Sequence, residues 1–157
     1  MRNGTMKLEK LLVPVDFSKS SEMAFRYAKF LAEKFSAGIH LLHVVDKRYV
    51  QRIAELNGES EEEVSRKLSL QAKEKLEVFL SKNDSEGLAD ERNVAVGIVF
   101  QTIALKALAL GADLIVMGGH GRVGDGQIDK IFFGSAAERV VRLLPCPVLC
   151  VPQEIAG

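Results

Sequence analysis

The sequence predicts an α/β protein in which helices cover both faces of one parallel sheet. Five short apolar segments have the near-continuous hydrophobicity of strands that are buried on both faces. Between them, apolar residues recur at three- and four-residue spacing, as in helices that pack on a sheet. Alternating strands and helices joined by right-handed crossovers form a doubly wound sheet. The strands are expected at residues 11–15, 39–45, 94–99, 114–117 and 147–151.

About four helices are expected between these strands. The first covers residues 20–35. The second follows a long connection and begins at Ser60, because the Ser-Glu-Glu-Glu sequence there is typical of a capped helix N-terminus. The third and fourth cover residues 102–110 and 135–144, the last ending before Pro145. The expected fold is a flavodoxin-like or Rossmann-like three-layer α/β/α structure with a five-stranded parallel sheet in the order 3-2-1-4-5.

Length and charge limit the number of domains and the class of partner. The 157 residues suit one domain, 1–157, with a core at about 10–152. The 21 basic and 21 acidic residues cancel, so we expect no broad basic surface for a nucleic acid or an anionic membrane. No apolar stretch approaches the roughly 18 residues of a membrane span, and Met1 to Lys10 lacks the apolar core of a secretory signal. We therefore expect a cytoplasmic protein.

The cysteines and histidines show no pattern of a disulfide framework or a metal site. On one extended strand, the Cα atoms of Cys146 and Cys150 would be about 13 Å apart, too far for a disulfide. Neither cysteine has the spacing to a histidine that metal ligands usually have. We expect both sulfurs to pack in the core, with a redox or interface role as the alternative. His40 and His43 are expected to be structural, whereas His120 is equally compatible with a ligand contact.

The candidate site lies where the first, second and fourth strands end. In an open α/β sheet, ligands bind outside the carboxyl ends of the strands, at the point where the strand order reverses. After the fourth strand, a glycine-rich stretch leaves backbone amides accessible to phosphate oxygens. Gly134 and Ser135 begin the fourth helix, whose N-terminal amides form a second anion site. The stretch matches neither the Walker nor the dinucleotide pattern. Its glycines are Gly118, Gly119, Gly121, Gly124 and Gly126.

Two of these features have simpler explanations, which the sequence leaves open. Ser135 and Glu138 have the spacing of a capping box, which would place a carboxylate where a phosphate is expected. Asp16 follows a strand and precedes a helix, where an aspartate often forms an Asx turn. Each residue could therefore serve the local backbone rather than a ligand.

Taken together, the segments resemble the universal stress protein (UspA-like) family from about Lys10 to Pro152. The segments that carry the resemblance are 11–18, 41–46, 112–118 and 145–151. The ATP-binding branch of that family has the motif Gly, two residues, Gly, nine residues, Gly, then Ser or Thr. In this chain twelve residues separate Gly121 from Gly134, so the motif contains three extra residues, best placed around 124–126.

The resemblance implies a site for ATP, or for ADP or AMP, with Mg²⁺ or Mn²⁺ bound to the phosphates. The implied base and ribose contacts are Pro14, Val15, Asp16, Val44, Met117 and Gly118. The residues implied around the phosphates are Gly119, His120, Gly121, Arg122, Gly134, Ser135 and Ala136.

The expected function is a nucleotide-dependent switch that acts in the stress response. We find no set of residues arranged for phosphoryl transfer, so the protein is not expected to be primarily a catalyst. One alternative is a slow nucleotide hydrolase that uses His120 and Asp16 as acid and base. Another is an interaction module whose nucleotide site the extra residues have destroyed. The closing strand, Val148 to Val151, would lie at a sheet edge, and the resemblance implies a homodimer through it.

Overall fold

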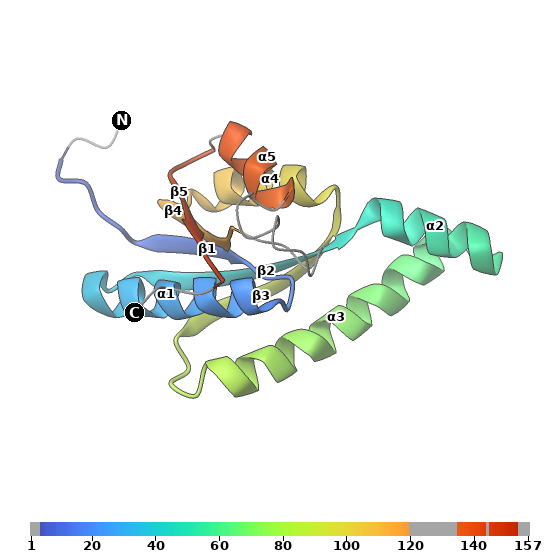
Figure 1. Ribbon diagram of the computed structural model, residues 1–157, viewed down its shortest axis with the longest axis horizontal. Coiled ribbons are helices and arrows are strands. Elements are labelled where there is room, and N and C mark those ends of the chain that lie inside the picture. The colour runs from blue at the N-terminus through green and yellow to red at the C-terminus, as the bar shows by residue number, and fades with distance from the viewer. Residues whose placement is uncertain (1–3, 120–134, 144, 154–157) are drawn as a thin grey trace.

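The computed structural model describes residues 4–119, 135–143 and 145–153. The expected site residues His120, Gly121, Arg122 and Gly134, and the extra residues at 124–126, lie outside the described residues. The elements, in chain order, are β1 (Lys10–Pro14), α1 (Lys19–Phe35), β2 (Gly38–Asp46), α2 (Lys47–Asn57), α3 (Glu61–Asn83), β3 (Ala89–Gly97), α4 (Val99–Leu110), β4 (Leu114–Gly118), α5 (Ser135–Leu143) and β5 (Val148–Val151) (Figure 1).

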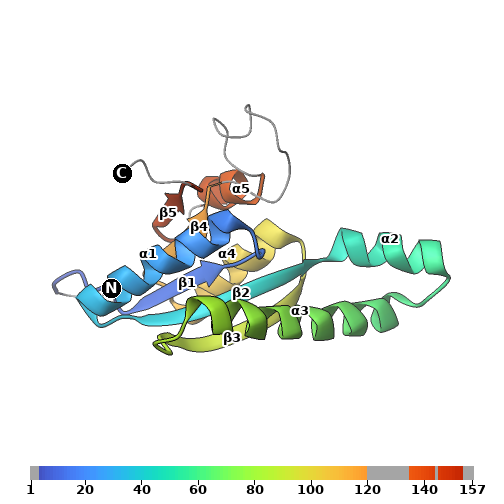
Figure 2. The same cartoon turned by 60° about the horizontal axis from the view of Figure 1, so that its bottom comes forward.

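The strands form one parallel sheet in the order β3-β2-β1-β4-β5, which confirms the predicted topology. Helices α1 and α3 cover one face, and α4 and α5 cover the other (Figures 1 and 2). The strand order reverses at β1, because β2 lies on one side of it and β4 on the other. The carboxyl ends of these strands therefore meet at the crevice where such sheets bind ligands.

Two buried clusters fill the spaces between the sheet and the helices. Successive side chains of a strand point to opposite faces, so Leu11 and Val13 pack under α1, whereas Leu12 packs under α4 and α5. Phe25 of α1 is fully buried in the first cluster. Burial on both faces explains why β1 is continuously apolar in the sequence.

The predicted starts of α1 and α3 are confirmed, and each start has a serine cap. Ser18 Oγ accepts a hydrogen bond of 3.2 Å from the amide of Ser21. Ser60 Oγ accepts one of 3.2 Å from the amide of Glu63. Such caps satisfy amides that have no partner within the helix.

Helix α2 was not expected, and the long connection predicted between β2 and the Ser60 helix was wrong. Asp46 caps α2 by accepting a 2.9 Å hydrogen bond from the amide of Arg48, and Gly58 ends the helix in the left-handed conformation. Val50 and Ala54 bury its narrow apolar face in a third cluster with residues of α3. The described residues therefore form five helices rather than four.

Strand β3 also differs from the prediction at both ends. It begins at Ala89, earlier than predicted. Its first residues have polar, mostly exposed side chains, as an edge strand often does, so they do not form an apolar run in the sequence. It ends at Gly97, and Val99 begins α4 rather than ending the strand. At Gly97 a Cβ would overlap Oγ1 of Thr102, so a larger residue would require that side chain to rotate.

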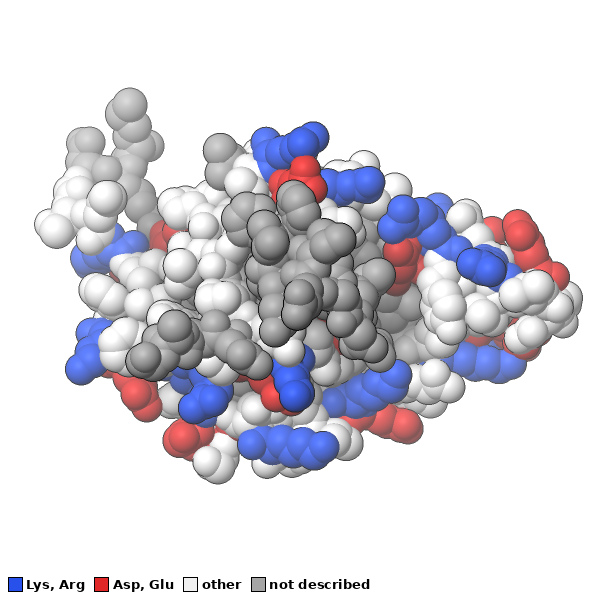
Figure 3. Space-filling view, in the orientation of Figure 1, with Lys and Arg blue, Asp and Glu red and all other residues white. Residues whose placement is uncertain are grey.

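Charges of both signs are interspersed on the face of the molecule seen in Figure 3, without a continuous basic patch. Helix α2 and the first half of α3 extend beyond the end of the sheet (Figures 1 and 2). Within the described part of the chain, no helix is both long and apolar enough to cross a membrane.

Candidate functional site

The structure gathers six of the expected site residues at the carboxyl edge of the sheet. Pro14 of β1 is in register with Leu42, and the amide of Val15 continues the pairing with a 2.8 Å bond to the Leu42 carbonyl oxygen. Val44 and Met117 lie on the neighbouring strands and belong to the cluster under α4 and α5. The six residues are Pro14, Val15, Asp16, Val44, Met117 and Gly118.

Asp16 forms the Asx turn that the sequence left open. Its Oδ1 accepts hydrogen bonds from the Ser18 amide at 3.0 Å and from Ser21 Oγ at 2.6 Å. The Asp16 amide in turn donates to Ser21 Oγ at 2.9 Å. Among the described residues, Oδ2 has no hydrogen-bond donor. One carboxylate oxygen therefore holds the β1–α1 connection in place, and the other is left for a ligand.

Phe17 and His43 contact each other beside the β1–α1 connection, on the side that faces α3. Phe17 has a φ of 66°, a left-handed conformation that is strained for a bulky residue. Its ring stacks on His43 with centroids 4.5 Å apart. Nδ1 of His43 lies 2.7 Å from the carbonyl oxygen of Val15, and it is the donor because a carbonyl oxygen only accepts. His43 thus has the structural role expected for it.

His40 also has a structural role. Its Nδ1 lies 3.3 Å from Oε2 of Glu91 on the adjacent strand β3. This contact lies outside the carboxyl edge of the sheet, because His40 is in the first half of β2.

Gly118 lets the start of α1 approach β4 closely. A Cβ at this position would lie 2.8 Å from Cβ and 2.9 Å from the carbonyl carbon of Ser20, closer than real atoms pack. Ser20 is buried, and its Oγ donates to the carbonyl oxygen of Val151 at 3.5 Å. Gly118 is therefore required by the packing of the site, whatever it contacts in a ligand.

The Gly119 amide is already used within the protein. It donates a 2.8 Å hydrogen bond to the carbonyl oxygen of Val151, which extends the pairing of β4 with β5. The expectation that this amide contacts a phosphate is therefore not supported. Gly119 still borders the crevice, because it directly follows β4.

Helix α5 begins at Ser135, as predicted. Ser135 is exposed, whereas Ala137 is 1% exposed and anchors the first turn in the cluster under the sheet. Glu138 Oε1 accepts a 2.8 Å hydrogen bond from Arg142, one turn later, so this oxygen is not turned toward the helix start as a capping box requires. The first amides of a helix have no partner within it and attract anions. Ser135 and Ala136 thus lie where a phosphate could bind.

Asp46, at the end of β2, is a capping residue. Besides the Arg48 amide, its carboxylate contacts the Arg48 guanidinium at 2.9 Å. The side-chain hydrogen bond from Arg48 is the main cause that holds the pKa of Asp46 below the usual 3.8. Asp46 therefore stays ionised and paired at the start of α2.

Ser18 and Ser21 were not predicted as site residues. Both position Asp16 through hydrogen bonds to Oδ1. The available signal was the run of serines directly after the aspartate, in Asp16-Phe17-Ser18-Lys19-Ser20-Ser21.

Cys146 and Cys150 are half-buried and pack against the cluster under α4 and α5. Burial raises the pKa of both thiols, so they are mainly protonated at neutral pH. Both cysteines pack against the core, as expected, although neither is fully buried; Cys150 lies on the edge strand β5. Among the described residues, no group of three or more His, Cys, Asp or Glu side chains could hold a metal ion.

Comparison with known proteins identifies close relatives. Universal stress protein MJ0577 of Methanocaldococcus jannaschii is 31% identical over 93% of this chain and 96% of its own length. Its solved structure has a TM-score of 0.79 at 30% identity and covers 96% of this chain and 100% of that one. Universal stress protein MJ0531 of the same organism is 33% identical over 98% of this chain and 87% of its own.

More distant structures share the fold. The universal stress protein of Archaeoglobus fulgidus, solved in complex with dAMP, has a TM-score of 0.60 at 24% identity and covers 93% of this chain and 99% of that one. The model of the universal stress protein family matches residues 7–152. The match spans almost the whole chain and includes every described strand and helix. The chain therefore belongs to the universal stress protein family.

Proposed function

We propose that this protein binds an adenine nucleotide, ATP or else ADP or AMP, at the carboxyl edge of the sheet. It acts as a nucleotide-dependent regulatory switch in the stress response, as a single domain in the cytoplasm. The observation that carries the proposal is the gathering of Pro14, Asp16, Val44, Met117 and Gly118 where the strand order reverses. Open α/β sheets bind their ligands at this point.

The residues at this edge suit the parts of a nucleotide. Val44 and Met117 are apolar residues on the two strands beside β1, and an adenine base could pack at the edge that they border. Oδ2 of Asp16 lies at the end of β1, where it can accept a hydrogen bond from a ribose hydroxyl or from a metal-bound water. The N-terminus of α5, at Ser135 and Ala136, provides amides and a positive dipole for the phosphates.

The phosphate contacts proposed at His120, Gly121, Arg122 and Gly134 rest on the sequence. A glycine-rich loop that binds through its amides needs no excess of basic residues, and the chain has none. A Mg²⁺ or Mn²⁺ ion would be held by phosphate oxygens and waters, which agrees with the lack of a carboxylate cluster among the described residues.

Relatives support a nucleotide ligand. The Archaeoglobus fulgidus protein of the same fold was solved with dAMP, and another universal stress protein, with a TM-score of 0.56, was solved with cAMP. Both ligands contain adenine, so the fold accommodates this base.

Binding, rather than catalysis, is the proposed role. Phosphoryl transfer requires a residue that positions the attacking water and groups that neutralise the γ-phosphate. Asp16 Oδ1 is engaged by Ser18 and Ser21, and Oδ2 is assigned to a ribose hydroxyl or a metal-bound water, so the carboxylate is proposed as a ligand contact rather than as a base. Weak ATP hydrolysis is the alternative, and phosphate release above that of a Gly121→Val variant would support it.

We also propose a homodimer formed through β5. The carbonyl oxygens of Pro147 and Val151 accept hydrogen bonds from Ile115 of β4 and from Gly119, which follows β4. Backbone groups of alternate residues in a strand point to opposite sides, so those of Val148 and Cys150 point away from β4. A second copy of β5 could pair with these groups.

Two measurements on the purified protein test the nucleotide proposal. Denaturation should release a nucleotide that chromatography and mass spectrometry identify as an adenine nucleotide. Thermal unfolding with Mg²⁺ and ATP at 100 times the dissociation constant should show a gain of about 2.7 kcal/mol in stability. No released nucleotide together with no shift by ATP, ADP or AMP would favour the interaction-module alternative.

A further inference from the structure

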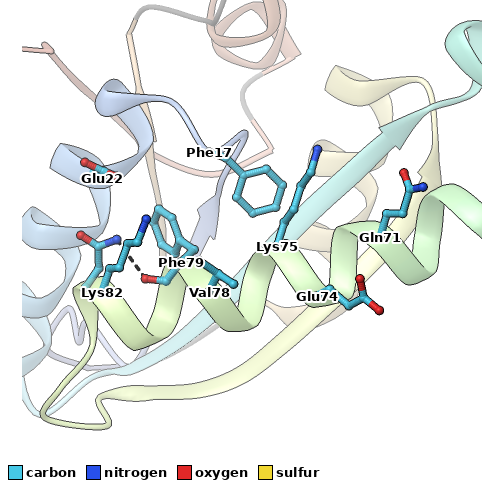
Figure 4. A pocket seen from close by; sticks show the side chains of 9 residues that line it. Phe17, Glu22, Gln71, Glu74, Lys75, Val78, Phe79 and Lys82 are labelled. Carbon is cyan, nitrogen blue, oxygen red and sulfur yellow. Dashed lines mark hydrogen bonds between the residues drawn. The ribbon is translucent and has the colours of Figure 1, made fainter.

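A cavity of about 510 Å³ lies between the β1–α1 connection and α3 (Figure 4). This volume is within the range of small-molecule sites. We call it the α1–α3 groove and define it by Phe17, Glu22, Lys75, Val78, Phe79 and Lys82. It borders the proposed nucleotide site at the β1–α1 connection, since Phe17 directly follows Asp16, but none of the proposed nucleotide contacts lines it.

The floor of the groove is aromatic. The rings of Phe17 and Phe79 meet edge to face, with centroids 6.2 Å apart. Val78 is 53% exposed beside them. The backbone of Phe17 is strained, and its ring stacks on His43. The ring is therefore held at the groove at an energetic cost. Phe79 is 5% exposed, so the accessible apolar surface of the groove comes mainly from Phe17 and Val78.

Two lysines give the groove a positive charge. Lys75 and Lys82 lie about two helical turns apart on α3, and their side chains extend alongside the rings of Phe17 and Phe79 (Figure 4). Neither lysine forms an ion pair with another residue of the described chain. The ammonium groups are therefore left to attract an anion.

The acidic residues of the groove do not cancel this charge. Glu74 points away from the two rings (Figure 4). Glu22 lies in the first turn of α1, where the helix dipole favours a carboxylate. Neither carboxylate forms an ion pair with the ammonium group of Lys75 or Lys82.

We propose that the α1–α3 groove binds a small planar aromatic anion. Its ring packs on the accessible part of the Phe17 ring, and its carboxylate is attracted by the ammonium groups of Lys75 and Lys82. Ring-on-ring packing provides affinity beyond buried area, and the lysines select for the anionic form. The competing explanation is that the lysine stems merely cover the apolar floor while their charges stay in water.

Cinnamate is a suitable probe, with the neutral and nearly isosteric cinnamamide as its control. In an amide NMR titration, cinnamate should bind with a dissociation constant on the order of 1 mM, as expected for a ligand of this size. Its shifts should centre on Phe17 and on the second half of α3. Lys75→Gln and Lys82→Gln should each weaken binding by about two- to five-fold. Val78→Glu, on an exposed wall, should abolish it.

The controls separate this site from the nucleotide site and from surface charge in general. Lys73→Gln removes a lysine of α3 that does not line the groove and should leave binding unchanged. Saturation with ATP should also leave it unchanged, since none of the proposed nucleotide contacts lines the groove. Equal binding of cinnamamide, or unchanged binding in the Lys75→Gln/Lys82→Gln double variant, would mean that the lysines only cover the floor. Either result, competition by ATP, or no saturable binding would overturn the proposal.

Discussion

At the scale of single residues, Asp16 combines a structural role with the proposed ligand contact. Oδ1 holds the β1–α1 connection through Ser18 and Ser21. Oδ2 lies at the carboxyl edge of the sheet without a donor from the described residues. Substitutions of Asp16 can therefore distinguish the structural role of Oδ1 from the proposed ligand contact of Oδ2.

Asp16→Ala should destabilise the fold, whereas Asp16→Asn should mainly weaken nucleotide binding. The alanine variant leaves the Ser18 amide and Ser21 Oγ without an acceptor, which costs about 1–3 kcal/mol. Asparagine keeps one acceptor oxygen but removes the negative charge. Urea denaturation and ATP titration of both variants measure the two effects. Equal loss of stability in both variants would contradict this division.

Gly118→Ala should destabilise the protein by about 1–3 kcal/mol, because the new methyl group overlaps Ser20 at the start of α1. Urea denaturation measures the change. Gly87→Ala is a comparison, because its Cβ would meet nothing within 4 Å and only its φ of +68° is strained. A Gly118→Ala loss no larger than that of Gly87→Ala would show that Ser20 can move aside.

At the scale of secondary-structure elements, α2 depends on the cap and ion pair of Asp46. Asparagine is also a good helix cap, so Asp46→Asn tests the ion pair with Arg48 rather than the cap. The pKa of Asp46 is lower in the folded protein than the usual 3.8, so folding favours the ionised carboxylate. This contribution is present above the unfolded pKa and is lost as the pH falls through the folded pKa.

The wild type should therefore be more stable than Asp46→Asn by about 0.5 kcal/mol at neutral pH, as is usual for an exposed pair. The difference should disappear as the pH falls below 3.8. Urea denaturation of both proteins across this range measures it. A difference that stays constant with pH would show that Arg48 does not stabilise the carboxylate.

The strands could be predicted because β1, β2 and β4 are buried on both faces and form apolar runs in the sequence. The meeting of Pro14, Val44 and Met117 at one edge of the sheet could also be predicted, because it follows from the strand order. Helix α2 could not, since it buries only Val50 and Ala54, mainly against α3 and the end of β2, and so has a narrow apolar face. The start of β3 could not, because its edge residues are polar. Nor could the pairing of the Gly119 amide with Val151, which depends on the register of two strands distant in sequence.

At the scale of the whole molecule, the proposed homodimer depends on β5. Cys150→Pro removes an amide that faces away from β4, so the sheet should remain intact while pairing with a second copy is lost. Sedimentation should find the wild type as a dimer at micromolar concentration and Cys150→Pro as a monomer, with unchanged circular dichroism. A wild type that sediments as a monomer, or a variant that stays dimeric, would count against the β5 interface.

Hydrogen–deuterium exchange of the wild-type protein, with and without saturating ATP and Mg²⁺, tests nucleotide binding and its location together. Binding at the carboxyl edge should slow exchange in peptides that cover Asp16, Val44, Met117 and the start of α5. Exchange in α2 and the first half of α3, which extend away from this edge, should not change. Unchanged exchange throughout the chain, or slowing confined to α2 and α3, would contradict a nucleotide site at the end of the sheet.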